Sequence, residues 1–177
     1  MPKGCSAAQF KYYLPKAVIE FPRNAFADFL FETKIKMADD IYKATIQYAG
    51  DEFFIGTTPS GHALTVDTKG TRKTAPTPLE MLLVSVAACT AADVVSILEK
   101  RRQKISAYRV EIEGERRSDF PRAFIKFRIR HIVRGRDVSE QAVASAIELS
   151  DTKYCSVAAT VRPTATIETS FEIVEDR

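Results

Sequence analysis

The sequence has few of the residues that build disulfide-bonded, metal-bound or linker-rich proteins. Its 177 residues include three cysteines, too few for a disulfide framework, and such sparse use is typical of a reducing compartment. The two histidines, His62 and His131, lie 69 positions apart with no cysteine pair near either, so the spacing predicts no metal site. Seven glycines and eight prolines exclude collagen-like architectures. We expect a cytoplasmic protein that needs no cofactor.

Charge and hydropathy exclude two further classes of protein. The net charge of +3 is far from that of a dedicated nucleic-acid-binding protein. One basic strand face, formed by Lys126, Arg128 and Arg130, is balanced by glutamates on the preceding predicted strand, which indicates a solvated surface. The most apolar segment, residues 81–98, carries Asp93 near its middle, and this favours a buried helix over a membrane span.

The first 36 residues differ in composition from the rest of the chain. They hold seven of the 17 phenylalanines and tyrosines and three of the eight prolines. We interpret residues 1–36 as a docked arm or an N-terminal extension, and we predict that the compact domain spans residues 37–177.

Most of the remaining chain has the two-residue period of strands. The predicted strands cover residues 41–48, 53–55, 62–66, 108–113, 125–130 and 165–174. Turn signals separate the first three, which predicts a three-stranded antiparallel meander. The fourth and fifth strands alternate apolar and charged residues, so each is expected to bury one face. The fold class is predicted to be α+β.

Two helical regions interrupt the strands. Thr77, Pro78 and Glu80 form a predicted capping box with proline at the first helical position, and the helix can continue to about Arg102. Residues 81–92 are apolar or small on almost every face. Because a helix that is apolar all round must be buried all round, we expect a second copy of the chain to cover one side.

The second helical region contains a predicted break. Asp137 or Ser139 caps a helix of amphipathic spacing, which we expect residues 151–154 to interrupt. A short apolar helix over residues 155–161 then ends before Pro163.

The two internal cysteines are the candidate chemical groups. Cys89 lies in the middle of the apolar helix, and Cys155 begins the short helix, close to Lys153. Either thiol can be a packed core residue, but two thiols brought together from two helices form a dithiol redox site. The attacking sulfur of such a site needs a nearby cation. Glu80 either orients that cation or serves only the capping box.

Two motifs carry a resemblance to a known family. The run from Pro78 to Leu98, which contains Ala87-Ala88-Cys89-Thr90, resembles the central helix of the OsmC/Ohr family, whose members include organic hydroperoxide resistance proteins. The run Lys153-Tyr154-Cys155-Ser156-Val157 is similar to that family's second cysteine motif. The chain is identified as an OsmC-like protein, most similar to the YhfA-type branch, over about residues 41–175.

This resemblance implies both an architecture and a reaction. It implies an intertwined homodimer in which curved antiparallel sheets pack on two long central helices. It also implies reduction of a small organic hydroperoxide, with Cys89 as the peroxidatic residue, Cys155 as the resolving one and Glu80 as a third site residue. A dithiol carrier of lipoyl or thioredoxin-like type is the expected reductant. Neither a membrane nor a nucleic acid is expected as a partner.

Two positions depart from the family pattern, and they leave a second function open. Active members have a glutamate ten positions before the first cysteine, where this chain has Leu79, and Glu80 is nine before. Those members also use an arginine from the N-terminal strands, but residues 41–66 contain none, and Arg72 or Lys73 is the available substitute. The alternative function is a non-catalytic stress protein that binds an apolar ligand at the dimer interface.

Overall fold

The structure is a computed structural model that describes residues 41–176; the predictions for residues 1–36, the domain boundary after residue 36 and Cys5 lie outside this part. Its elements are β1 (Thr45–Tyr48), β2 (Phe53–Thr57), β3 (Ala63–Asp67), α2 (Pro78–Lys100), β4 (Lys104–Arg116), β5 (Phe124–Arg136), α3 (Glu140–Leu149), a π-helical turn (Ser150–Tyr154), α4 (Ser156–Val161) and β6 (Thr166–Glu175). This arrangement is the α+β fold that the sequence predicts.

The first sheet has the order β1-β2-β3 and is antiparallel throughout. The predicted meander is therefore confirmed, although its first strand begins only at Thr45. Glycines with positive φ occupy both turns, Gly50 at 97° and Gly61 at 82°. Such angles are open to glycine at little steric cost, which is why the turn signals in the sequence were reliable here.

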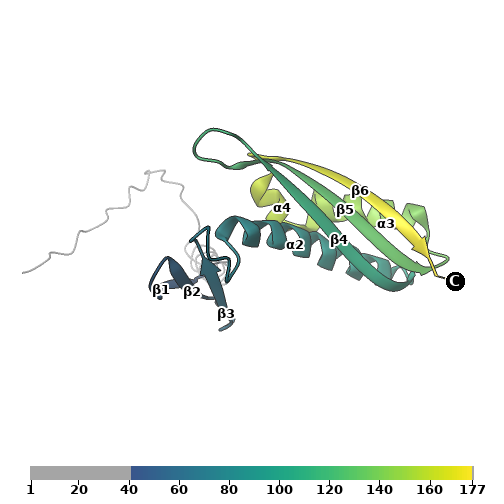
Figure 1. The fold of residues 1–177 in the computed structure, drawn as a ribbon. Helices are drawn as coiled ribbons and strands as arrows, with labels where there is room; N and C mark the ends of the chain where they lie inside the picture. Colours follow the sequence, from purple (N-terminus) through teal and green to yellow (C-terminus); the bar gives the residue numbers. More distant parts are fainter. Residues whose placement is uncertain (1–40, 177) are drawn as a thin grey trace, which may run out of the picture. The chain divides into compact units, whose positions relative to one another are not determined.

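The second sheet has the order β4-β5-β6, and it is mixed. Strands β4 and β5 form a long antiparallel hairpin, but β6 runs parallel to β5. The chain returns from β5 to β6 through α3, the π-helical turn and α4, and a long helical crossover is the connection that parallel neighbours require. Figure 1 shows α2, α3 and α4 along one face of this sheet.

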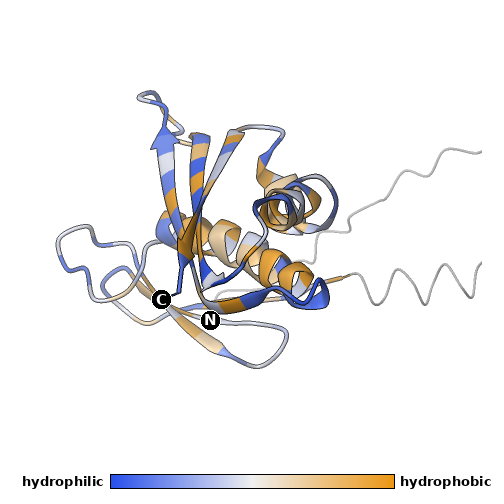
Figure 2. Cartoon of the chain, turned by 90° about the vertical axis from the view of Figure 1, so that its right-hand side faces the viewer, coloured by the Kyte–Doolittle hydropathy of each residue, from blue (hydrophilic) through white to orange (hydrophobic). Residues whose placement is uncertain are grey.

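The two faces of the second sheet differ in polarity, as the alternation predicts. Figure 2 shows alternating apolar and polar bands along these strands. On the face toward the helices, Phe127, His131 and Val133 of β5 are fully buried. On the outer face, Arg128 pairs with carboxylates of both neighbouring strands, at 2.9 Å from Glu115 on β4 and 3.8 Å from Glu168 on β6. The basic strand face is thus charge-balanced, as the sequence indicates.

The interior contains two hydrophobic clusters, and α2 contributes to both. Val86 belongs to the first, and Val94 and Leu98 belong to the second. Gly114 of β4 permits a close approach, because a Cβ atom there would lie 2.4 Å from the ring of Phe124. The clusters hold the middle of α2 in a fixed position against the sheet and the other helices.

Helix α2 is also the one helix within residues 41–176 that is long and apolar enough to cross a membrane by length and composition alone. In this fold it packs against β4, α3 and α4. Its buried residues, Val86, Thr90, Val94 and Leu98, follow one another at intervals of four. The helix therefore buries one face within the chain and leaves the opposite face open.

Candidate functional site

The beginning of α2 is built as the sequence predicts. Thr77 is the N-cap, its hydroxyl accepts from the backbone N–H of Glu80, and the Glu80 carboxylate accepts from the backbone N–H of Thr77 at 2.7 Å. These hydrogen bonds lower the pKa of Glu80. The helix ends at Lys100 rather than Arg102, because Arg102 has a φ of 57° and cannot continue it.

Cys89 lies in the middle of this helix, at the edge of its buried face. The residue is half-buried, and Thr90 beside it is buried. Asp93 follows four positions later, which places it one turn along the same side of the helix. The capping box fixes the start of α2, and Val86 and Val94 pack in the core. These contacts hold Cys89 in place relative to the core.

Cys155 is placed by an irregular turn that the sequence interpretation got wrong. Residues 151–154 do not break the helical path after α3 but continue it as a π-helical turn, which closes where Cys155 N–H donates to the carbonyl of Ser150 at 2.9 Å. Cys155 is the N-cap of α4, and its sulfur accepts from the backbone N–H of Ala158 at 3.3 Å. Only 4% of this residue is exposed.

The structure brings the two thiols together. The sulfur atoms of Cys89 and Cys155 and a carboxylate oxygen of Asp93 all lie within 4.8 Å of one another. Burial raises the pKa of Cys155 to about 11, and the neighbouring Cys89 thiol and the charge of Asp93 act in the same direction. Cys155 is therefore a protonated thiol at neutral pH, and the half-buried Cys89 is the more accessible of the two sulfurs.

Asp93 is the site residue that the sequence analysis missed as a functional group. Its Oδ2 accepts from the hydroxyl of Ser150 at 3.0 Å, and that hydroxyl oxygen lies 3.1 Å from Oγ1 of Thr90. The available signal was its spacing of four from Cys89 on a helix, but it served only as an argument against a membrane span. No salt bridge within residues 41–176 reaches Asp93.

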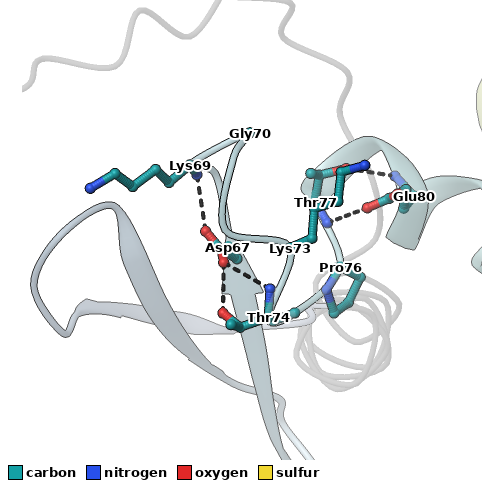
Figure 3. Close-up of a pocket in the computed structure, with 9 residues that line it drawn as sticks. Asp67, Lys69, Gly70, Lys73, Thr74, Pro76, Thr77 and Glu80 are labelled. Atoms are coloured by element: carbon teal, nitrogen blue, oxygen red, sulfur yellow. Dashed lines mark hydrogen bonds between the residues drawn. The ribbon is translucent and has the colours of Figure 1, made fainter.

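The predicted cation-binding residues lie elsewhere, in the loop before α2. Arg72 donates to buried Asp67 at 2.9 Å and to Asp51 at 2.7 Å, and so it is held in a local ion-pair network. Hydrogen bonds from Arg72 and Thr74 hold the pKa of Asp67 far below its usual range. Figure 3 shows this loop folded around Asp67, with the Thr77–Glu80 capping pair beside it.

Glu80 faces a cavity of this same region. The cavity has a volume of about 430 Å³, and Asp67, Lys73 and Glu80 are among its lining residues. Nine residues of helix separate Glu80 from Cys89, about 13.5 Å at 1.5 Å per residue. Within one chain the structure therefore does not bring Glu80, Arg72 or Lys73 to the thiols, and the role of Glu80 beyond capping stays a prediction.

A second cavity adjoins the thiol pair. It has a volume of about 380 Å³ and is lined by Asp93, Ile97, Lys100 and Tyr154 among others. Tyr154 directly precedes Cys155, and a carboxylate oxygen of Asp93 lies within 4.8 Å of both sulfur atoms. The cavity therefore lies beside the thiol pair, although neither cysteine is among its lining residues.

Comparisons with known proteins find a matching family model and related chains. The family model described as OsmC-like protein matches residues 69–170. Protein YhfA of Escherichia coli K12 is 40% identical over 132 residues, which cover 75% of this chain and 98% of the relative. A hypothetical protein of Aquifex aeolicus, 30% identical, aligns with a TM-score of 0.69 over 78% of this chain and 99% of that one.

More distant solved structures share the fold alone. An OsmC-like protein of Mycoplasma pneumoniae is 17% identical, with a TM-score of 0.67 over 77% of this chain and 99% of that chain. A Legionella pneumophila protein described as an organic hydroperoxide resistance protein is 13% identical, with a TM-score of 0.57 over 75% of this chain and 96% of that chain.

Proposed function

Since the chain belongs to the OsmC-like protein family, we propose that it is a thiol peroxidase that reduces organic hydroperoxides through Cys89 and Cys155. One observation carries the proposal: two thiols 66 positions apart in the sequence have their sulfur atoms within 4.8 Å. Distant structural relatives described as organic hydroperoxide resistance proteins add support from the fold.

The proposed reaction has three balanced steps. Cys89 attacks the O–O bond of the hydroperoxide, becomes a sulfenic acid and releases the alcohol, so that the thiol is oxidised and the peroxide reduced. The Cys155 thiol then condenses with the sulfenic acid, which forms a disulfide and releases water. A reduced dithiol carrier returns both cysteines to thiols and itself becomes a disulfide.

Burial supports the division of roles between the two sulfurs. Cys89 is half-buried and can meet a substrate, whereas Cys155 is 4% exposed and has a raised pKa. A buried protonated thiol is a poor first nucleophile, but it can resolve a sulfenic acid within reach. The sulfurs must approach from at most 4.8 Å to about 2.05 Å for the disulfide to form.

The proposal includes a homodimer in the cytoplasm. On α2, Val84 is 65% exposed, and Ala88 and Ala92 are exposed on the same face. An open apolar face on the central helix is covered if two copies of α2 pack together. Glu80 and the cation that it would orient can then act only across the interface between the copies, because they do not reach Cys89 within one chain.

A second candidate function rests on the charges near the thiols. In the part of the chain that the structure describes, the Asp93 carboxylate lacks a salt-bridge partner, and Arg72 is committed to Asp51 and Asp67. A carboxylate with no paired cation disfavours a thiolate beside it. The alternative is a non-catalytic protein that binds an apolar ligand at the dimer interface.

Intact mass before and after one equivalent of tert-butyl hydroperoxide separates the two functions. In a Cys5→Ser background, we expect loss of two hydrogens, mapped by digestion to a disulfide between Cys89 and Cys155. The further change Cys155→Ser is expected to give gain of one oxygen at Cys89. Cys89→Ser is expected to remain unmodified. An unchanged mass of the reduced parent protein would exclude the peroxidase and favour the binding protein.

A further inference from the structure

We propose that Cys89, Asp93 and Cys155 form a binding site for one thiophilic divalent cation, of which Zn²⁺ is the representative. Their two sulfur atoms and one carboxylate oxygen form the one group of this kind found within residues 41–176. Three protein ligands leave the fourth position of a tetrahedral ion free for water or a ligand, as in catalytic and regulatory zinc sites. The inference uses the residues of the proposed peroxidase but does not require that reaction.

The distances suit a tetrahedral ion after a small contraction. With Zn–S near 2.3 Å and Zn–O near 2.0 Å, the ligand atoms of a tetrahedral site lie about 3.5–3.8 Å apart. The three atoms here are within 4.8 Å of one another, so each pair closes by about 1.3 Å at most. Cys89 and Asp93 are four residues apart on one side of a helix, the spacing that lets two side chains reach the same ion.

The surroundings orient the ligands and leave room for the ion. Ser150 donates to Oδ2 of Asp93 and leaves the other carboxylate oxygen free, which is the role of an outer-shell partner in metal sites. The cavity of about 380 Å³, which Asp93 and Tyr154 line, opens beside one of the three ligands.

The chemistry of the donors selects the ion. Two thiolates favour Zn²⁺ over Mg²⁺ and Ca²⁺, which prefer oxygen ligands. The ligands together carry up to three negative charges, and within residues 41–176 no salt bridge neutralises the carboxylate. A disulfide offers no thiolate to the ion, so metal binding through both sulfurs and disulfide formation exclude each other.

The test is a titration of the reduced, chelator-treated full-length protein with Zn²⁺ in competition with a coloured chelator, and with Co²⁺ followed by absorbance. We expect one ion per chain and, for Co²⁺, a thiolate-to-cobalt charge-transfer band with tetrahedral visible bands. Cys89→Ser and Asp93→Asn are each expected to weaken Zn²⁺ binding at least 100-fold. Ser150→Ala is expected to weaken it about 10- to 100-fold. Circular dichroism verifies that each variant is folded.

Two matched controls make the titration decisive. Asp119→Asn removes an exposed carboxylate far from the thiols in sequence, and Cys5→Ser removes the third thiol; both are expected to bind Zn²⁺ as the parent protein does. Less than one ion per chain, binding unchanged in folded Asp93→Asn, or loss of binding in Cys5→Ser would each overturn the proposal. Zinc binding by a protein that is inert to tert-butyl hydroperoxide would refute the peroxidase alone, and peroxide-driven disulfide formation without zinc binding would refute the metal site alone.

Discussion

The two faces of α2 have similar composition but different surroundings. One face carries Val86, Val94 and Leu98, all fully buried against the sheet and the other helices. The opposite face carries Val84, 65% exposed, together with small residues. Figure 2 shows that the helix is apolar or near neutral in hydropathy along most of its length. Apolar composition alone therefore does not predict which face of the helix is buried within its own chain.

The reactive groups lie on the boundary between these faces. Cys89 and Asp93 are both half-buried, between the buried stripe and the open one. Side chains on such a boundary pack against the core on one side and are accessible to solvent on the other. The folded chain positions the thiols, and in the two proposals above a second copy or an ion completes their surroundings.

The largest effect is expected from a charge on the open face. Ala88→Glu would place a carboxylate in the proposed dimer contact, and twofold symmetry would place it there twice. Because an unpaired buried charge costs several kcal/mol, we expect the dimer dissociation constant to rise by about 10³-fold or more. Sedimentation velocity at several concentrations measures this. Ala144→Glu, the same change at an exposed position of α3, should leave association unaltered. Equal dissociation constants for the two variants would mean that the open face of α2 is not the dimer contact.

The next effect concerns the buried face. Leu98→Ala removes a fully buried side chain from the second hydrophobic cluster, and we expect the free energy of unfolding to fall by about 3 kcal/mol. Ile125→Ala, at a position 41% exposed near the start of β5, is expected to cost about 1 kcal/mol or less. Urea unfolding at one protein concentration gives both values, and similar losses would mean that this face of α2 is not the core.

Lowering the pH compares an interior group with a surface one. His131 is fully buried beside Tyr108, whose hydroxyl lies 2.5 Å from Nδ1, and burial lowers the pKa of His131 from 6.5 to about 4. As the pH falls below 6.5 the unfolded chain takes up a proton before the folded chain does. The stabilisation is therefore complete above pH 6.5 and is lost toward pH 4, by about 2 kcal/mol at pH 5.

The histidine variants isolate this contribution from that of the carboxylates. The loss of unfolding free energy between pH 7.5 and pH 5 is expected to be smaller by about 2 kcal/mol in His131→Gln. His62→Gln changes an exposed side chain that contacts Ser60, and it should keep the parent pH dependence. Parallel curves for the parent protein and His131→Gln would show that His131 is solvated.

Local signals explain what the sequence could predict. The capping box of Thr77 and Glu80 and the N-cap Ser139 are formed by residues within three positions, so they can be recognised without tertiary structure. The meander follows from alternation and its turn glycines, and the hairpin of β4 and β5 follows from alternation. The meeting of Cys89 and Cys155 was accessible only through the resemblance to a family, because 66 residues separate them.

The features that sequence analysis missed depend on hydrogen bonds and contacts made after folding. Residues 151–154 are typical of a helix break, yet one extra residue in the turn lets Cys155 N–H reach Ser150 and keeps the path helical. Asp93 belongs to the site because the folded chain brings Ser150 and Cys155, which lie far away in the sequence, next to it. Similarly, the parallel pairing of β6 follows from the crossover and not from its own residues.

The smallest expected effect lies at the beginning of α2, where the structure gives Glu80 a capping role and the proposed reaction gives it a second one. Thr77→Ala removes the hydroxyl that accepts from Glu80 N–H and should cost about 1 kcal/mol, whereas Thr77→Ser should cost a few tenths. Glu80→Gln keeps an oxygen that can accept from Thr77 but removes the charge, so its loss should be smaller than that of Thr77→Ala.

Stopped-flow oxidation of Cys89 by tert-butyl hydroperoxide separates the two roles, because both variants disturb the cap and only one removes a carboxylate. If Glu80 orients a cation across a dimer, Glu80→Gln slows the reaction at least tenfold and Thr77→Ala leaves its rate within twofold. Equal rates in the two variants would leave Glu80 as a cap alone. Any cation at the thiols would then have to be held by groups nearer the middle of α2, where Asp93 lies beside both sulfurs.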